Sequence, residues 1–266
     1  MVSFIKKNNQ VVFIGAGNVA TNLSLAMREA GFSIVQIYSR SMDSAQLLAE
    51  KLHCSYTTQI NEITTGADLY IFAIRDDALN EVIATLPSGK GLWIHTSGSL
   101  TLDIFRGHTA YYGVLYPLQT FSKHHNANFA KVPLFVEGNT VNVETAIYDI
   151  AGRMSENVTI LSSDKRKYLH LAAVFACNFN NHLYTIASQI LEKQGIDWHV
   201  LQSLIDETAH KLYSMHPRQA QTGPAVRNDQ KIMELHKTLL EDGQARNLYT
   251  MISENIQFQY NNKAQR

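Results

Sequence analysis

Residues 11–20 read VVFIGAGNVA, an apolar run that ends abruptly in two glycines, and this stretch decides the fold. Consecutive apolar side chains are typical of a strand that is buried on both faces of a parallel sheet. Gly15 permits a tight turn, Gly17 lets the backbone approach a pyrophosphate, and Ala20 allows a helix to pack closely on the strand. A plain tight turn is the alternative. The strand, the glycines and the following helix together predict a dinucleotide site.

The first 160 residues alternate apolar runs of strand length with amphipathic stretches of helix length. Continuous apolar strands separated by helices are typical of a parallel sheet that is covered on both faces. We therefore expect an α/β fold with a doubly wound sheet of the Rossmann type. The expected strands are 11–15, 33–38, 68–74, 91–96, 111–116, 133–138 and 157–161, and the expected early helices are 18–30, 42–52 and 77–86.

The pattern changes near residue 162, after which no further strand is expected. Two prolines and a glycine within residues 214–229 predict an irregular loop. We therefore expect a dinucleotide-binding domain over 1–162 and an all-helical domain for substrate binding and dimerisation over 163–266. The expected helices of the second domain are 164–195, 197–215, 229–241 and 245–260.

The composition excludes several classes of protein. The 23 basic and 23 acidic side chains cancel, so no large field favours nucleic acid or an anionic membrane. The sequence has no apolar run long enough to span a membrane and no signal peptide at its start. Two cysteines and eleven histidines without metal-ligand spacing predict neither a disulfide framework nor a metal site. We expect a cytoplasmic protein.

The residues after the second expected strand bear on the choice of cofactor. An acidic residue there would bind the ribose hydroxyls of NAD, whereas an arginine accommodates the 2′-phosphate of NADP. The chain has Ser39, Arg40 and Ser41 there, with no acid before Asp43. Arg40 could instead be a solvated loop residue and Ser41 a helix cap, and capping is compatible with phosphate binding. The charge pattern favours NADP.

The expected cofactor site is completed by the stretch FAIRDDAL at 72–79, where a strand ends. Ligands of such sheets lie beyond the carboxyl ends of parallel strands, so the backbone there should face the cofactor. The residues that we expect to contact NADP are Gly15, Ala16, Gly17, Asn18, Val19, Ser39, Arg40, Ser41, Ala73 and Ile74.

The stretch IHTSGSL at 94–100 follows another expected strand, which places it near the nicotinamide. His95 is either a proton donor or a buried, hydrogen-bonded histidine. Ser97 is either part of the catalytic site or a cap for the turn that follows. Both alternatives stay open for both residues.

A polar stripe runs along the expected helix at 164–195. At about 100° per residue, Lys167, His170, Asn178 and Asn181 share one side of an otherwise apolar helix. Buried polar groups need partners, so the stripe is either an interhelical contact in a dimer or the wall of a substrate cleft. In the cleft, His170 or Lys167 would donate a proton and Asn178 would orient the substrate, with Asn181 as a further contact.

The stretch TGPAVRND at 222–229 contains Arg227, which is either a surface residue or a clamp for a substrate carboxylate. Asp229 is most simply a charge at the start of the next helix.

Several motifs together resemble a known family. The sequence is similar to the superfamily of pyrroline-5-carboxylate reductase and deazaflavin-dependent NADP oxidoreductase, and more closely to a Rossmann-like NADP oxidoreductase family with a helical C-terminal domain. That family often has His-Pro where this chain has Tyr116-Pro117, and we place Tyr116 among the substrate-binding residues. The related β-hydroxyacid dehydrogenases have a lysine and an asparagine on such a helix, which by analogy supports the cleft. The motifs of the closer match are HTSGSL (95–100), YPLQTFS (116–122), YLHLAAVFACNFNNHL (168–183) and TGPAVRND (222–229).

The motifs and the resemblance imply an NADP-dependent oxidoreductase that transfers a hydride between NADPH and a small carbonyl or imine. The alternative is a non-catalytic NADP-binding sensor or scaffold. The largely apolar surface of the helix at 164–195 predicts a homodimer through the helical domain.

Overall fold

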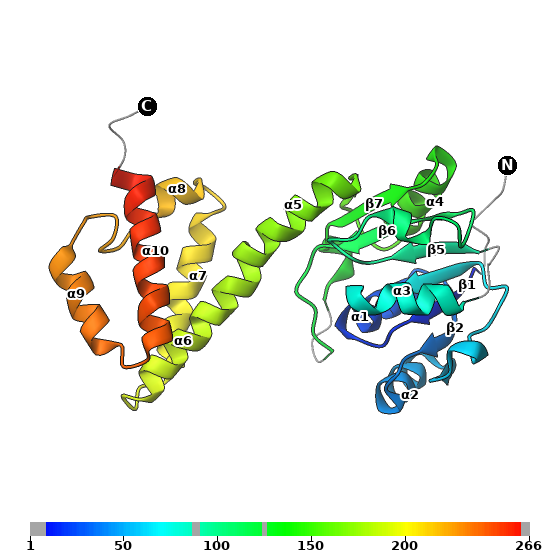
Figure 1. Ribbon diagram of the computed structural model, residues 1–266, viewed down its shortest axis with the longest axis horizontal. Coiled ribbons are helices and arrows are strands. Elements are labelled where there is room, and N and C mark those ends of the chain that lie inside the picture. The colour runs from blue at the N-terminus through cyan, green and yellow to red at the C-terminus, as the bar shows by residue number, and fades with distance from the viewer. Residues whose placement is uncertain (1–8, 87–90, 124–126, 262–266) are drawn as a thin grey trace. The chain divides into compact units, whose positions relative to one another are not determined.

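A computed structural model describes residues 9–86, 91–123 and 127–261 of the chain (Figure 1). These residues form two compact units, Met1–Asn178 and Phe179–Arg266. The sequence pattern changes earlier, near residue 162, where the last strand gives way to helix. The first half of the long helix therefore belongs to the unit that contains the sheet.

The first unit is built on one eight-stranded sheet with the order β3-β2-β1-β4-β5-β6-β7-β8. Neighbouring strands are parallel except β6 and β7, which are antiparallel. β8 is parallel to β7, so these two strands run opposite to the other six. The strands are β1 (Gln10–Ile14), β2 (Ser33–Tyr38), β3 (Ser55–Thr57), β4 (Leu69–Phe72), β5 (Leu92–His95), β6 (Tyr112–Pro117), β7 (Leu134–Gly138) and β8 (Val158–Ile160).

The reversal of direction at β7 departs from the all-parallel sheet that the sequence predicts. A parallel connection needs a crossover, usually a helix, that returns the chain to the opposite edge. The described part of the β6–β7 connection contains the short 3₁₀ turn Phe129–Lys131 and no α-helix. β7 therefore starts at the edge where β6 ends, and Leu134 pairs with Pro117.

Helices cover both faces of this sheet. Val11 and Phe13 of β1 pack into a core under α1 (Asn18–Glu29), α2 (Met42–Leu52) and α4 (Val141–Gly152). Val12 and Ile14 point the other way, into a core under α3 (Asp76–Thr85) that also contains Trp93. Because successive strand residues face opposite sides, a strand covered on both faces must be apolar throughout. The apolar run at the start of the chain is explained by this arrangement.

One strand and one α-helix of the first unit were not expected from the sequence. β3 is a three-residue edge strand of sequence SYT, two residues of which are exposed, so it carries no apolar signal. α4 does carry one: Val143, Ile147 and Ile150 recur at helical spacing and are fully buried. Thr140 also caps α4 by accepting a hydrogen bond from the amide of Val143.

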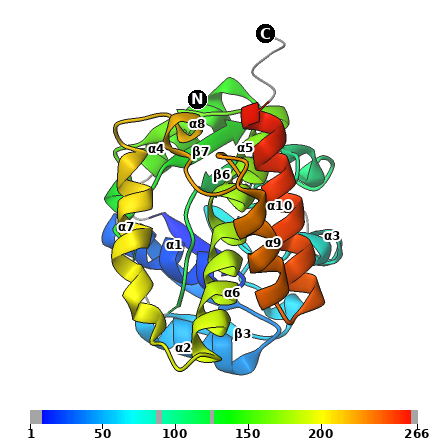
Figure 2. The same cartoon turned by 90° about the vertical axis from the view of Figure 1, so that its left-hand side faces the viewer.

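The second unit is all-helical, as predicted, and Figure 2 shows α9 and α10 running beside each other. The expected loop at 214–229 is irregular except for one short helix, α8. Among the described residues of this unit, only Ala225 and Met233 are buried. No helix in the described part of the chain is both long and apolar enough to cross a membrane. The helices are α6 (Asn180–Glu192), α7 (Gln202–Lys211), α8 (Pro217–Ala220), α9 (Gln230–Leu239) and α10 (Gly243–Asn261).

Candidate functional site

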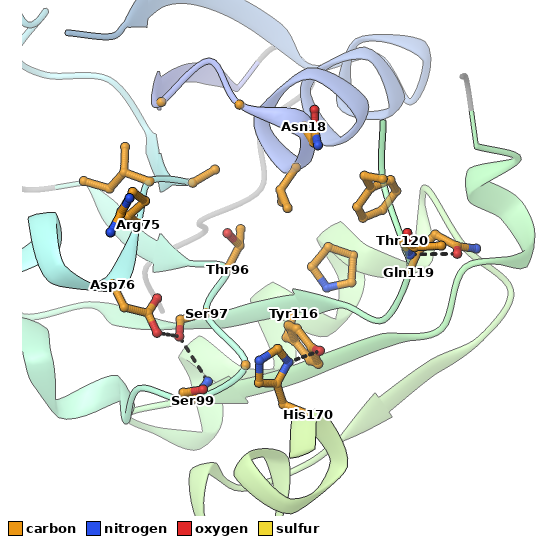
Figure 3. A pocket seen from close by; sticks show the side chains of 18 of the residues that line it. Asn18, Arg75, Asp76, Thr96, Ser97, Ser99, Tyr116, Gln119, Thr120 and His170 are labelled. Atoms are coloured by element: carbon orange, nitrogen blue, oxygen red, sulfur yellow. Dashed lines mark hydrogen bonds between the residues drawn. The ribbon is translucent and has the colours of Figure 1, made fainter. Parts of the chain in front are cut away.

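A cavity of about 1070 Å³ opens at the carboxyl edge of the sheet, within the first unit. Its walls are the loops that follow β1, β2, β4, β5 and β6, together with one side of α5 (Ser163–Ala173) and the helical turn after it. Carboxyl edges of such sheets are where ligands bind, because the loops that follow the strands converge there. Figure 3 shows the side chains that point into this space.

The glycine turn after β1 forms one end of the cavity. Gly15 has a φ of +119°, and a Cβ atom there would lie 2.3 Å from the carbonyl oxygen of Ala73, so no other residue fits. A Cβ atom on Gly17 would meet nothing within 4 Å, which leaves open space beside the backbone. α1 begins there without a side-chain cap and without an acid in its first turn. This cradle fits the pyrophosphate of a dinucleotide.

The residues that the sequence predicts for the adenosine phosphate line the same end of the cavity. Ser39, Arg40 and Ser41 all lie there, and Arg40 is exposed. The Ser41 hydroxyl also accepts a hydrogen bond of 3.4 Å from the amide of Ser44, which caps α2. The structure thus shows the capping role of Ser41, and this role is compatible with the phosphate contact that the sequence predicts.

Arg75 also lines this end, although the sequence did not single it out. Its guanidinium donates to both carboxylate oxygens of Asp77, at 3.1 and 2.8 Å. These hydrogen bonds lower the pKa of Asp77. Arg75 directly follows an expected strand, and this position would have identified it as a residue of the site.

The opposite end of the cavity brings together Tyr116 and His170, which are 54 residues apart in the sequence. The Tyr116 oxygen and His170 Nδ1 are 2.9 Å apart, and the two rings meet edge to face (Figure 3). A Cβ atom on Gly98 would lie 2.7 Å from His170 Nδ1, so the ring packs directly on this glycine. The loop, the strand and the helix thus hold the imidazole from three sides.

A π-helical segment, Val174–Phe179, interrupts the long helix and places Asn178 at the cavity. In an uninterrupted α-helix, Asn178 would lie about 80° around the axis from His170. A π turn takes up one extra residue, which turns Asn178 back by about 100° towards His170. Cys177, which the sequence analysis did not consider, lines the cavity next to it.

Ser97 lines the cavity, but its hydroxyl has a structural role. It donates to the carboxylate of Asp76 at 2.9 Å and accepts from the amides of Ser99 and Leu100, each at 3.1 Å. Because its single proton is already committed to Asp76, the capping alternative describes Ser97 better than the catalytic one. Asp76 itself lines the cavity and is not among the site residues that the sequence predicts.

His95 is not at the cavity wall, and the structure favours its buried alternative. The side chain is fully buried, Nε2 lies 3.3 Å from the Thr101 carbonyl oxygen, and Nδ1 accepts from the amide of Ser97. Burial, with the charge of Arg166 as a smaller cause, lowers the pKa of His95 to about 3. A ring that is neutral near pH 7 and has both nitrogens occupied is not a proton donor to substrate, which corrects the catalytic assignment of His95.

Lys167 is a further residue that is not brought to this cavity. Its ammonium pairs with Asp164 at 3.0 Å, one turn back along α5. Lys167 therefore points along the helix surface, and its proposed proton-donor role is corrected. Asn181 and Arg227 belong to the second unit, and their substrate contacts stay predictions.

A buried arginine anchors the helix that carries His170. Arg166 is 1% exposed, and its guanidinium pairs with Glu137 of β7 at 2.8 Å and donates to Ser163 at 3.0 Å. It also donates to the carbonyl of Leu100, in the loop that contains Gly98. This cluster fixes the start of α5 against the sheet, one turn before His170.

Comparisons with known proteins agree with this architecture. Residues 10–94 match the family described as NADP oxidoreductase, coenzyme F420-dependent, and residues 132–256 match a domain of unknown function, DUF2520. A solved structure from Bacteroides fragilis, described as a candidate NADP oxidoreductase, is 41% identical. It superposes with a TM-score of 0.92 over 96% of this chain and 99% of its own. No curated protein sequence matches the chain.

Two more distant structures share the fold. Pyrroline-5-carboxylate reductase from Streptococcus pyogenes is 15% identical, with a TM-score of 0.63 over 95% of this chain and 99% of its own. An imine reductase from Myxococcus stipitatus, solved in complex with NADP⁺, is 14% identical, with a TM-score of 0.60 over 93% and 91%. At these identities the likeness shows the common fold.

Proposed function

The chain belongs to the family of NADP oxidoreductases that the Bacteroides fragilis protein represents, and from this premise we propose that it transfers a hydride between NADPH and a small carbonyl or imine. Membership of the family confirms NADP as the expected cofactor. The distant likeness to pyrroline-5-carboxylate and imine reductases supports a C=N or C=O bond as the reacting group.

One observation carries the proposal: a single cavity joins the glycine turn and Arg40 to the Tyr116–His170 pair. Small-molecule sites commonly occupy about 300–1,000 Å³, so a cavity of about 1070 Å³ has room for a dinucleotide with a small substrate. An anion cradle and a titratable side chain thus line the same space.

When bound, NADPH supplies the hydride. The glycine turn and the start of α1 hold the pyrophosphate, and Ser39, Arg40 and Ser41 hold the 2′-phosphate. His170 supplies the proton that the substrate oxygen or nitrogen gains, because its imidazole lines the cavity and imidazole is a common general acid. Asn178 offers an amide that orients the carbonyl or imine.

The proposal is tested by following NADPH absorbance with a panel of cyclic imines, small aldehydes and keto acids. We expect turnover with at least one class of substrate and a clear preference for NADPH over NADH. Tight NADPH binding without turnover of any panel member would instead support the non-catalytic sensor or scaffold.

We also propose that the chain works as a homodimer through its helical unit. Large apolar side chains are exposed there on several helices, for example Leu204, Leu239 and Met251 at 63%, 69% and 68%. A unit of this size that buries only two of its described residues needs a partner surface to form a core. A second copy of the chain would supply it. Light scattering at micromolar concentration should give the dimer mass, and a monomer mass would refute the proposal.

We propose that the protein is located in the cytoplasm. Cys54 and Cys177 are both free thiols, which suits a reducing compartment.

A further inference from the structure

The hydroxyl of Tyr116 and one ring nitrogen of His170 form an isolated hydrogen bond at the cavity wall. Tyr116 is 8% exposed, its oxygen lies 2.9 Å from His170 Nδ1, and the contact is edge to face. Within the described ranges of the chain, His170 is the hydrogen-bond partner of this hydroxyl. The Tyr116 hydroxyl is therefore matched to one ring nitrogen of His170.

The surroundings keep the hydroxyl protonated and the ring in place. Burial raises the pKa of Tyr116, although the charge of Arg166 acts in the opposite direction. Gly98 leaves the space into which the imidazole packs, because a Cβ atom there would lie 2.6 Å from His170 Cγ. Nδ1 is therefore held against a neutral phenol.

The chemistry of imidazole then restricts the direction of this hydrogen bond. A phenol can donate or accept, and a neutral imidazole has one N–H and one acceptor nitrogen. If the phenol donated to Nδ1, the neutral ring would carry its proton on Nε2 and could not act as a base there. If the phenol accepts from Nδ1–H, Nε2 is free to gain and lose a proton while the ring stays in place.

We propose that Tyr116 is a positioning residue whose oxygen accepts a hydrogen bond from Nδ1–H of His170 in both protonation states of the ring. Nε2 is then the nitrogen that exchanges the proton. In the reductive direction the Nε2–H bond breaks, the substrate heteroatom gains that proton as its carbon gains the hydride of NADPH, and the ring is left neutral with its proton on Nδ1. Water reprotonates Nε2. This inference deepens the proposed function and rests on it for the proton transfer.

The tautomer of His170 tests the inference without any turnover. Nitrogen-15 NMR of the ring, at a pH at which it is neutral, distinguishes a proton on Nδ1 from one on Nε2, and His170→Asn identifies the signal. We expect the Nδ1–H form in the wild type. In Tyr116→Phe the acceptor is lost, so the ring should revert towards the Nε2–H form that histidine prefers in water.

Kinetics on the substrate found above provide the second readout. Tyr116→Phe should lower kcat about 10- to 100-fold, with KM and the NADPH dissociation constant nearly unchanged, because the ring is mispositioned rather than removed. Gly98→Ala should act in the same direction by displacing the ring. Tyr112→Phe is the matched control, since Tyr112 is an equally buried tyrosine at the other end of β6. It should change neither the tautomer nor kcat.

The outcomes separate the two proposals. A neutral His170 with its proton on Nε2 in the wild type would overturn the positioning role, even if His170 proves essential for turnover. An unchanged tautomer and unchanged kcat in Tyr116→Phe would overturn it as well. An Nδ1–H tautomer in a protein that turns over no substrate would leave the hydrogen-bond assignment standing and refute the proposed function alone.

Discussion

The two ends of the cavity are built from different parts of the polypeptide. The cofactor end is largely backbone: Gly15 and Gly17 create the space, and amides at the start of α1 face it. The opposite end is made by side chains that come from distant segments, such as Tyr116 and His170. A binding site that is formed by one turn can be recognised from ten consecutive residues of the sequence. A site that is formed by residues far apart in the sequence cannot be recognised in this way. Because the two ends are built from different segments, we predict that one substitution can lower turnover without weakening NADPH binding and that another can weaken NADPH binding alone.

The largest difference between the effect on turnover and the effect on cofactor binding is expected for His170→Ala. Removal of the imidazole should lower turnover by roughly 10²–10⁴-fold, the usual contribution of a general acid. NADPH affinity, measured by fluorescence titration, should stay nearly unchanged, because the glycine turn and Arg40 lie at the other end. A parallel loss of affinity would show that the two ends are not independent.

At the cofactor end, Arg40→Asp should reverse the nucleotide preference. The change removes a charged hydrogen-bond donor and introduces a charge that repels phosphate, so the NADPH-to-NADH affinity ratio should fall by roughly 100-fold. Arg106→Asp is the control, because Arg106 is an exposed arginine outside the cavity. A ratio that falls equally in both variants would mean that Arg40 does not contact the 2′-phosphate.

Away from the cavity wall, His95 should affect folding rather than chemistry. The unfolded ring binds a proton near pH 6.5 and the folded ring only near pH 3, so acid favours the unfolded chain between these values. The free energy of unfolding should therefore fall by about 2 kcal/mol from pH 7 to pH 5. Urea titrations should show a smaller fall in His95→Gln, whereas His53→Asn, at an exposed position, should keep the wild-type slope.

The smallest effect is expected for Gly17→Ala. The added methyl group meets no protein atom within 4 Å and Gly17 has a φ of −83°, so stability should be retained. The same methyl group would occupy space beside the pyrophosphate, which should weaken NADPH binding about tenfold. Gly152→Ala also adds a methyl group in open space but lies outside the cavity, so it should leave the affinity unchanged. Equal affinities of the two variants would place the pyrophosphate elsewhere.

The sequence was most informative where structure follows from local pattern. β2 and α2 have the bounds that their apolar periodicity predicts, and the residues expected at the cofactor all line the cavity. The direction of β7 was predicted wrongly, because an apolar run predicts a strand but does not indicate at which edge of the sheet that strand begins. β3 was missed because its three residues carry no periodicity.

At the substrate end, Tyr116, His170 and Asn178 line the cavity, whereas Lys167 and His95 do not, for geometric reasons. Lys167 and Asn178 were assigned to one stripe on the assumption of a constant rotation per residue. That spacing does not reveal the ion pair between Lys167 and Asp164. It also does not reveal the π segment that contains Asn178. The buried alternative for His95 depends on Thr101 and Arg166, and the sequence does not reveal that they surround it.

The π segment Val174–Phe179 has a consequence for how this chain can change. π-helical turns are rare and their geometry is less favourable than that of an α-helix. Deletion of one residue, for example Ala176, would restore regular α-helical hydrogen bonding. It would leave Asn178 about 20° around the axis from His170, which is where the π turn already places it. A shortened chain of this kind would gain helix stability and keep the amide at the cavity. Conversion of the segment to α-helix without a deletion would instead turn Asn178 away from His170 by about 100°, so the orientation of this wall depends on the π turn and the number of residues in the helix together.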